Sequence, residues 1–122
     1  MNKNLIYIRS NTFSKLNIDK AKRMLVYSFP DIVFTEPIIS VPANQTGLPF
    51  RNILGSFECE NPLEEVIDIL QSVEYSIALK PRHKANIQIL MEIELIQHGD
   101  TTLNTELMES KTVQSLFKDL DY

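Results

Sequence analysis

The chain has 122 residues, 43% of them apolar and 23% charged, and its formal net charge at pH 7 is −4. This length and composition are typical of one globular domain, which we expect to span residues 1–122. The acidic balance argues against a general nucleic-acid-binding surface, and no apolar run approaches the roughly 20 residues that cross a bilayer. Cys59 is the only cysteine, so no intramolecular disulfide can form. Since no apolar stretch typical of a signal peptide follows Met1, the sequence predicts a cytoplasmic protein.

The first half of the chain predicts a strand, a helix and a second strand. Leu5–Ile8 is rich in β-favouring residues and predicts the first strand. A helix is expected to follow, capped by Asn17 and ended by Pro30, which cannot continue a helix. Its buried stripe would consist of Ile18, Ala21, Leu25 and Phe29. Ile32–Thr35 predicts the second strand, and Pro37 limits how far its regular pairing can run.

A long loop, a third strand and a second helix come next. Residues 40–49 contain two prolines and one glycine, and long loops in compact domains are often functional. Phe50–Glu60 predicts the third strand, whose alternate residues point to opposite faces. One face would carry Ile53, Phe57 and Cys59, and the other Phe50, Asn52 and Leu54. The clearest helix start is Asn61, a good N-cap that precedes Pro62 at the first helical position.

The stretch Asn86–Ile96 has the strongest strand pattern in the chain. Its odd positions are all apolar and four even positions are polar or charged, which indicates one buried and one wetted face. Glu92 and Glu94 would therefore point the same way, about 6.5–7 Å apart. Two such carboxylates can hold a hard cation such as Mg2+, or can simply belong to a wetted surface. The turn Gly99-Asp100 then leads to a weaker helical pattern over 105–120.

The predicted order of elements is strand, helix, strand, strand, helix, strand and a helical tail. Two β-α-β units in this order predict an α+β fold, a ferredoxin-like βαββαβ sandwich. In this arrangement the two long helices cover one face of an antiparallel sheet. We expect the other face to be open to a ligand.

Several short motifs follow one another along residues 5–104. They are Tyr7-Ile8, Ser10-Asn11, Glu36-Pro37, Phe50-Arg51-Asn52, Asn61-Pro62-Leu63-Glu64-Glu65, Val73-Glu74, Glu92-Ile93-Glu94 and Gly99-Asp100. In order and spacing this series resembles the 6-hydroxymethyl-7,8-dihydropterin pyrophosphokinases of folate biosynthesis. The resemblance implies a ferredoxin-like fold. It also implies transfer of the β,γ-pyrophosphoryl group of ATP to the hydroxymethyl group of a pterin, with Mg2+ as the cofactor.

The resemblance further implies roles for individual residues. Phe50 and Asn52 fall on the family's F-x-N motif and, together with Pro37, would bind the pterin. A ring and an amide two residues apart share one strand face, so the ring can stack on a heterocycle while the amide hydrogen-bonds its edge. Glu92 and Glu94 fall on the family's D-x-D pair, which holds the Mg2+ that bridges the ATP phosphates.

Lys80, Arg82 and Lys84 form a cationic cluster before the last predicted strand. By resemblance it would bind the phosphates, and Arg82 would act in catalysis with Glu92 and Glu94. The alternative is an ordinary exposed loop.

The sequence departs from the family pattern mainly in the nucleotide half of the site. The acidic pair is Glu-x-Glu instead of Asp-x-Asp, and Asn86–Ile89 replaces a W-G-P-R type segment whose arginine contacts ATP. The chain is therefore either a diverged pyrophosphokinase with pterin and ATP as partners, or a protein that binds a pterin-like ligand without catalysis. A third alternative is an interaction domain that oligomerises through the open sheet face. We expect no nucleic-acid or membrane partner, and a monomer or a small homo-oligomer.

Overall fold

Six strands form one antiparallel sheet within residues 1–41, 48–78 and 88–120, the part of the chain that the computed structural model describes. The strands are β1 (Asn2–Ser10), β2 (Val33–Phe34), β3 (Ile38–Ser40), β4 (Phe50–Cys59), β5 (Glu92–His98) and β6 (Thr101–Thr102). They lie in the order β2-β4-β1-β5-β6, and β3 also pairs with β4. The helices of this part are α1 (Ser14–Ser28), α2 (Leu63–Ala78), α3 (Thr105–Met108) and α4 (Lys111–Phe117).

The prediction of an α+β, ferredoxin-like fold is confirmed by the strand order. From β1 the chain crosses through α1 to β2, and β4 lies between those two strands. From β4 it crosses through α2 to β5, with β1 in between. Each crossover therefore skips one strand, as in a split β-α-β unit, and β1 lies in the middle of the sheet.

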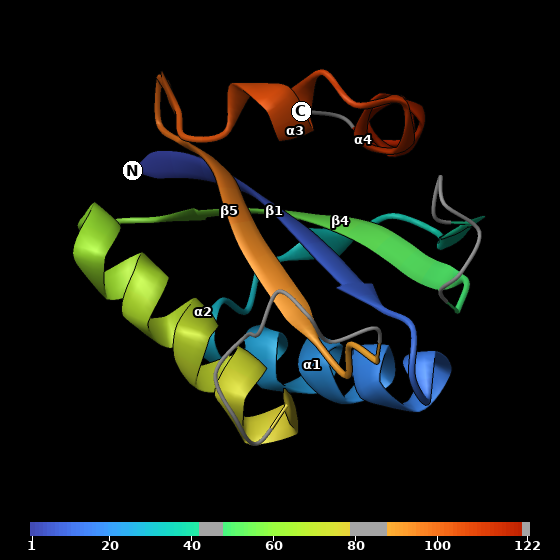
Figure 1. The fold of residues 1–122 in the computed structure, drawn as a ribbon. Helices are drawn as coiled ribbons and strands as arrows, with labels where there is room; N and C mark the ends of the chain where they lie inside the picture. Colours follow the sequence, from blue (N-terminus) through green and yellow to red (C-terminus); the bar gives the residue numbers. More distant parts are fainter. Residues whose placement is uncertain (42–47, 79–87, 121–122) are drawn as a thin grey trace.

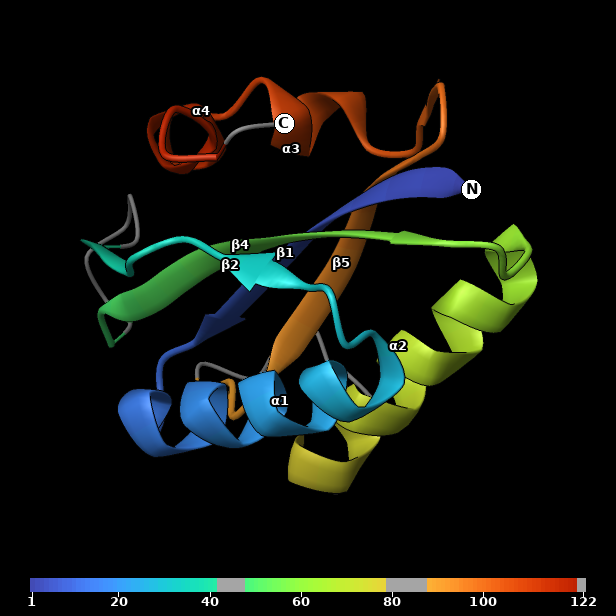
Figure 2. The ribbon, with the colours of Figure 1, turned by 180° about the vertical axis from the view of Figure 1, so that it is seen from behind.

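The two long helices cover one face of the sheet, and α3 and α4 lie on the opposite side (Figures 1 and 2). The apolar stripe of α1 packs against the sheet through the three buried residues Ile18, Ala21 and Leu25. Phe29, just after α1, stacks on Phe57 of β4 with ring centroids 3.9 Å apart. This layer contains the larger apolar core of the described residues, so the first face of the sheet mainly serves packing.

The beginning of α1 differs from the prediction. The helix begins at Ser14, and its N-cap is Phe13, whose φ of 47° lies in the left-handed region. Asn17 is therefore inside the first turn and is not the cap; its side-chain amide donates to the Thr12 carbonyl at 2.9 Å. The start of α2 is off by one residue from the prediction: the helix begins at Leu63, and the Pro62 carbonyl accepts its first hydrogen bonds, so Pro62 stands at the cap position predicted for Asn61.

Several predicted strands have different limits in the structure. The first is longer, since β1 covers Asn2–Ser10 and not only Leu5–Ile8. The second, predicted over Ile32–Thr35, is shorter, since β2 covers Val33–Phe34, and β3 after Pro37 was not predicted. The last strand begins at Glu92 and continues to His98, so the prediction of a strand over residues 88–91 is wrong; residues 86 and 87 lie outside the described part. The reason is that Asn11 fixes Ile89 beyond the end of β1. Its backbone N–H donates to the Ile89 carbonyl at 2.9 Å, and its Oδ1 accepts from the Ile89 N–H at 2.6 Å.

The second face of the sheet, the one on the side of α3 and α4, has an apolar cluster of its own. This corrects the prediction that the whole face is open, because α4 covers part of it with Val113 and Leu116, which are fully buried. The sheet residues of this cluster are Leu5, Tyr7, Leu54 and Ile96. Over the described residues, no helix is long and apolar enough to cross a membrane.

Candidate functional site

The strand register brings the two motif segments of the proposed ligand site onto one face. Arg9 of β1 pairs with Asn52 of β4 on one side and with Glu92 of β5 on the other. Adjacent strands are about 4.8 Å apart, so Asn52 and Glu92 lie about 9–10 Å apart in one row with Arg9 between them. In the neighbouring row, Tyr7 pairs with Glu94.

A pocket of about 430 Å3 lies on this face, and we call it the sheet-face pocket. Its floor is formed by strand residues, which are Tyr7, Arg9, Glu92 and Glu94, with Ser40 at the end of β3. Its wall comes from the C-terminal helices and the segments before them, through Asn104, Leu107, Ser110 and Thr112. The volume falls within the range of about 300–1,000 Å3 typical of small-molecule sites. The two acidic side chains therefore line a half-open pocket and not a flat surface.

Glu92 and Arg9 form the central ion pair of the sheet-face pocket. Arg9 Nε donates to Glu92 Oε2 at 2.6 Å, and the two side chains are 34% and 12% exposed, respectively. The guanidinium also lies over the Phe50 ring, 4.4 Å from its centroid. Arg9 thus joins the segment expected to bind a heterocycle to the carboxylate expected to bind a metal.

Asn52 is fully buried, and its amide is used within the chain. Its Oδ1 accepts from the Tyr7 hydroxyl, and its Nδ2 donates to the Ile38 carbonyl and the Ser40 hydroxyl, each at 2.9 Å. A further contact joins Nδ2 to the Phe50 carbonyl at 3.2 Å. An amide has two donor hydrogens, so a ligand would reach Asn52 only by replacing one of these partners.

The Tyr7 hydroxyl is the neutral link between Arg9 and Asn52. Burial raises the pKa of Tyr7 above its ordinary value of 10.0, and the negative charge of Glu92 acts in the same direction, while Arg9 opposes the rise. The phenol therefore keeps its proton at neutral pH and donates it to the Asn52 carbonyl oxygen. Tyr7, Asn52 and Ser40 thus form a hydrogen-bonded chain beside the ion pair of Arg9 and Glu92.

The other predicted site residues are placed as follows. Phe50 is buried at the start of β4, and its ring faces the Arg9 guanidinium. Pro37 is exposed between β2 and β3 and is not among the residues lining the sheet-face pocket. Lys80, Arg82 and Lys84 lie outside the described residues.

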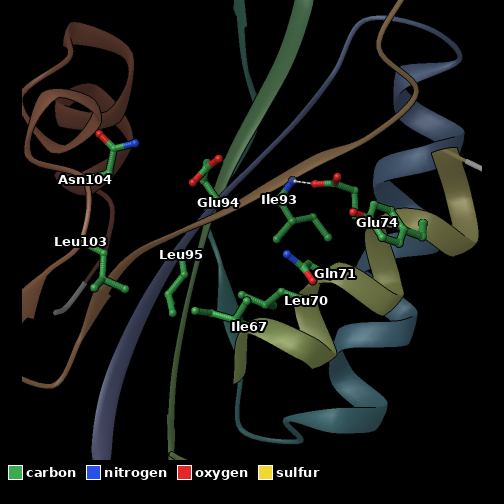
Figure 3. Close-up of a pocket in the computed structure, with 10 residues that line it drawn as sticks. Ile67, Leu70, Gln71, Glu74, Ile93, Glu94, Leu95, Leu103 and Asn104 are labelled. Atoms are coloured by element: carbon green, nitrogen blue, oxygen red, sulfur yellow. Dashed lines mark hydrogen bonds between the residues drawn. The ribbon is translucent and has the colours of Figure 1, made fainter. Parts of the chain in front are cut away.

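A second pocket, the β5-edge pocket, adjoins the first along the outer edge of β5 (Figure 3). It has a volume of about 470 Å3 and shares Glu94 and Asn104 with the sheet-face pocket. Glu74 of α2, which is 4% exposed, accepts from the Ile93 N–H at 2.8 Å and so holds β5 against α2. Glu94 points away from α2, on the side of Asn104. This carboxylate is where the two pockets meet.

The donor set around Glu92 and Glu94 suits a magnesium ion that arrives with a phosphate ligand. In the described part of the chain, no three His, Cys, Asp or Glu side chains gather to hold a metal. Mg2+ is usually held by one or two carboxylates together with waters and substrate phosphates, and not by a full protein cage. Two carboxylates are the number of protein ligands that this mode of binding uses, and one of them, Glu92, is paired with Arg9.

Several residues of the pocket were not singled out from the sequence. Arg9 lies two residues after Tyr7 and four after Leu5 on β1, so its side chain is on the same face of the sheet as theirs. Its pairing with Glu92 is shown only by the strand register. Ser40 and the wall residues from Asn104 onward have no distinctive motif. They join the site because the C-terminal helices fold back over the sheet (Figure 1).

Comparison with known proteins adds no family to this picture. No protein-family model matches the chain, and no curated protein matches it either.

Proposed function

We propose that this chain is a diverged pterin pyrophosphokinase that binds a dihydropterin and Mg-ATP at the second face of its sheet. One observation carries the proposal: Glu92 and Glu94 line one pocket, in register with the segment that contains Phe50 and Asn52. The motifs described above supply the substrate class. Because the reaction consumes ATP, we expect it to take place in the cytoplasm.

In the proposed reaction the pterin hydroxymethyl oxygen forms a bond to the β-phosphorus of ATP. The bond from that phosphorus to the α,β-bridging oxygen breaks, AMP leaves, and the hydroxyl proton passes to water. Mg2+, when bound, offsets the negative charge of the phosphates. Glu92 and Glu94 would hold this ion, and the Phe50–Asn52 segment would orient the pterin. Since Glu94 belongs to both pockets, ligands in the two pockets would lie on either side of one carboxylate.

Release of AMP from Mg-ATP in the presence of 6-hydroxymethyl-7,8-dihydropterin tests this function. Glu94→Gln removes a metal-binding charge and keeps the shape of the side chain, so turnover should fall at least about a hundredfold, as for groups that stabilise transition-state charge. Glu65→Gln on the exposed side of α2 is the matched control and should keep wild-type turnover. Absence of AMP release by folded wild-type protein at high concentration would reject the proposed enzyme.

A second candidate is a protein that binds a pterin-like heterocycle without catalysis. Two observations favour it: Glu92 is already paired with Arg9, and the Asn52 amide is satisfied within the chain. Quenching of pterin fluorescence without saturable binding of Mg-ATP would support this candidate. Saturable Mg-ATP binding that depends on Glu94 would contradict it.

A further inference from the structure

We propose that Arg9 is a phosphate-binding residue that Glu92 holds in place until a divalent cation takes over Glu92. The inference deepens the proposed function, on which it rests for the metal and the phosphate. No sequence motif indicates this role of Arg9, or its release when Glu92 binds a cation. Without ligand, Arg9 and Glu92 form an ion pair in the sheet-face pocket. With ligand bound, Glu92 would bind the cation and Arg9 would bind the phosphate.

The geometry of the guanidinium supports this exchange. Glu92 contacts Arg9 through Nε at 2.6 Å, on one side of the guanidinium. A guanidinium has five N–H donors, and its two Nη groups form the fork that matches two phosphate oxygens. At 34% exposure the Arg9 side chain also reaches the solvent-filled part of the pocket that it lines. A phosphate oxygen can therefore approach Arg9 from the open side.

Phe50 gives the guanidinium a surface that it can keep in both arrangements. The ring lies 4.4 Å from Arg9 Cζ, and stacking of a guanidinium on an aromatic face does not fix the direction of its N–H groups. Arg9 can thus turn its donors from Glu92 to a ligand while it remains on the ring. Lysine, with its compact ammonium group, has no planar group that could stack on the ring.

The charges of the pocket make cation and phosphate binding depend on each other. Of its described lining residues, Arg9 carries a positive charge, Glu92 and Glu94 carry negative charges, and the remainder are neutral at pH 7. A phosphate alone would meet two carboxylates, whereas a cation alone must compete with Arg9 for Glu92. A cation that arrives together with a phosphate meets neither obstacle, since each charged side chain then gains an opposite charge.

Binding of Mn2+, as a stand-in for Mg2+, and of inorganic pyrophosphate tests the exchange in the full chain. Arg9→Gln should bind Mn2+ alone about tenfold more tightly, because Glu92 loses its competitor; tenfold corresponds to about 1.4 kcal/mol. The same variant should bind pyrophosphate in the presence of Mn2+ about tenfold more weakly. If Arg9 had a purely structural role, the variant would bind both Mn2+ and pyrophosphate more weakly. A change of the two affinities in the same direction, or no change in either, would therefore overturn the proposal. So would absence of Mn2+ binding by the wild type and Arg9→Gln alike.

Two further variants keep the test decisive if Arg9→Gln fails to fold. Glu92→Gln frees the guanidinium and removes one negative charge, so pyrophosphate without metal should bind about tenfold more tightly than to the wild type; unchanged or weaker binding would overturn the proposal. Arg23→Gln is the matched control: Arg23 is exposed on α1, which covers the opposite face of the sheet, and the variant should leave both affinities unchanged.

The failure of this inference can be told from failure of the proposed function. If AMP release is absent but Arg9→Gln shifts the two affinities in opposite directions, the exchange of partners by Glu92 is supported and the proposed pyrophosphokinase function is rejected. If AMP is released but Arg9→Gln changes the two affinities in the same direction, the proposed enzymatic function is supported and Arg9 is a structural residue.

Discussion

Asn52 joins three strands through one amide group. It lies on β4, accepts from Tyr7 on β1, and donates to Ile38 and Ser40 at the two ends of β3. A buried amide that is fully hydrogen-bonded specifies how the surrounding strands pair, because leaving any partner unsatisfied in the interior costs free energy. The position of Asn52 below the sheet-face pocket therefore shapes the pocket floor.

Asn52→Ala should lower the free energy of unfolding by about 1–3 kcal/mol, the cost of burying polar partners without hydrogen bonds. Urea denaturation followed by circular dichroism measures the change. Gln71→Ala, at an exposed position of α2, is the control and should change stability by less than about 0.5 kcal/mol. An equally small change for Asn52→Ala would show that the amide does not hold these strands.

The Tyr7 hydroxyl should ionise at a higher pH than an exposed tyrosine. Its pKa is raised above 10.0 by burial and by Glu92. Because the folded state keeps this proton more firmly than the unfolded state, the contribution of Tyr7 to stability is complete below about pH 10 and is lost as pH rises through the raised pKa. Alkaline titration of phenolate absorbance in the wild type and in Tyr7→Phe isolates this group. A midpoint at or below 10.0 would contradict the buried placement.

The C-terminal helices turn the second sheet face from an open surface into a pocket. Val113 and Leu116 of α4 are fully buried against the sheet, and Asn104 and Ser110 cap α3 and α4 with their side chains. The same short helices supply the wall of the sheet-face pocket. Stability of this layer and the shape of the site are therefore coupled.

Leu116→Ala should lower the free energy of unfolding by about 2–5 kcal/mol, because it leaves a cavity under α4. It should also weaken ligand binding at the sheet-face pocket, since the wall above Glu94 loses its anchor. Chemical denaturation measures the first effect, and Leu103→Ala, at a position that is 39% exposed, is the control. Similar destabilisation by the two variants would indicate that α4 is not packed on the sheet.

The elements that the sequence predicts well are those whose signals are local. Asn61 and Pro62 mark the start of α2 to within one residue, and the two faces of β4 follow from alternation. The start of α1 could not be predicted, because Phe13 adopts a left-handed conformation that its side chain does not favour. The start of β5 depends on Asn11, a residue far away in the sequence.

At the scale of the whole molecule, one face of the sheet provides stability and the other combines packing with a polar pocket. The larger core lies under α1 and α2, while Leu5 and Tyr7 show that β1 is apolar on both faces. That double-sided pattern is visible in the sequence and indicates a covered second face. The pairing of Arg9 with both Asn52 and Glu92 is not visible there, because it depends on the register of three strands.

We propose that the sheet-face pocket around Glu92 and Glu94 binds a nucleotide phosphate through Mg2+. Calorimetric titration of the folded wild-type chain with a non-hydrolysable Mg-ATP analogue tests it most directly. We expect saturable binding that Glu94→Gln weakens at least about tenfold, or about 1.4 kcal/mol. No saturable binding, or binding that is unchanged in Glu94→Gln, would contradict it.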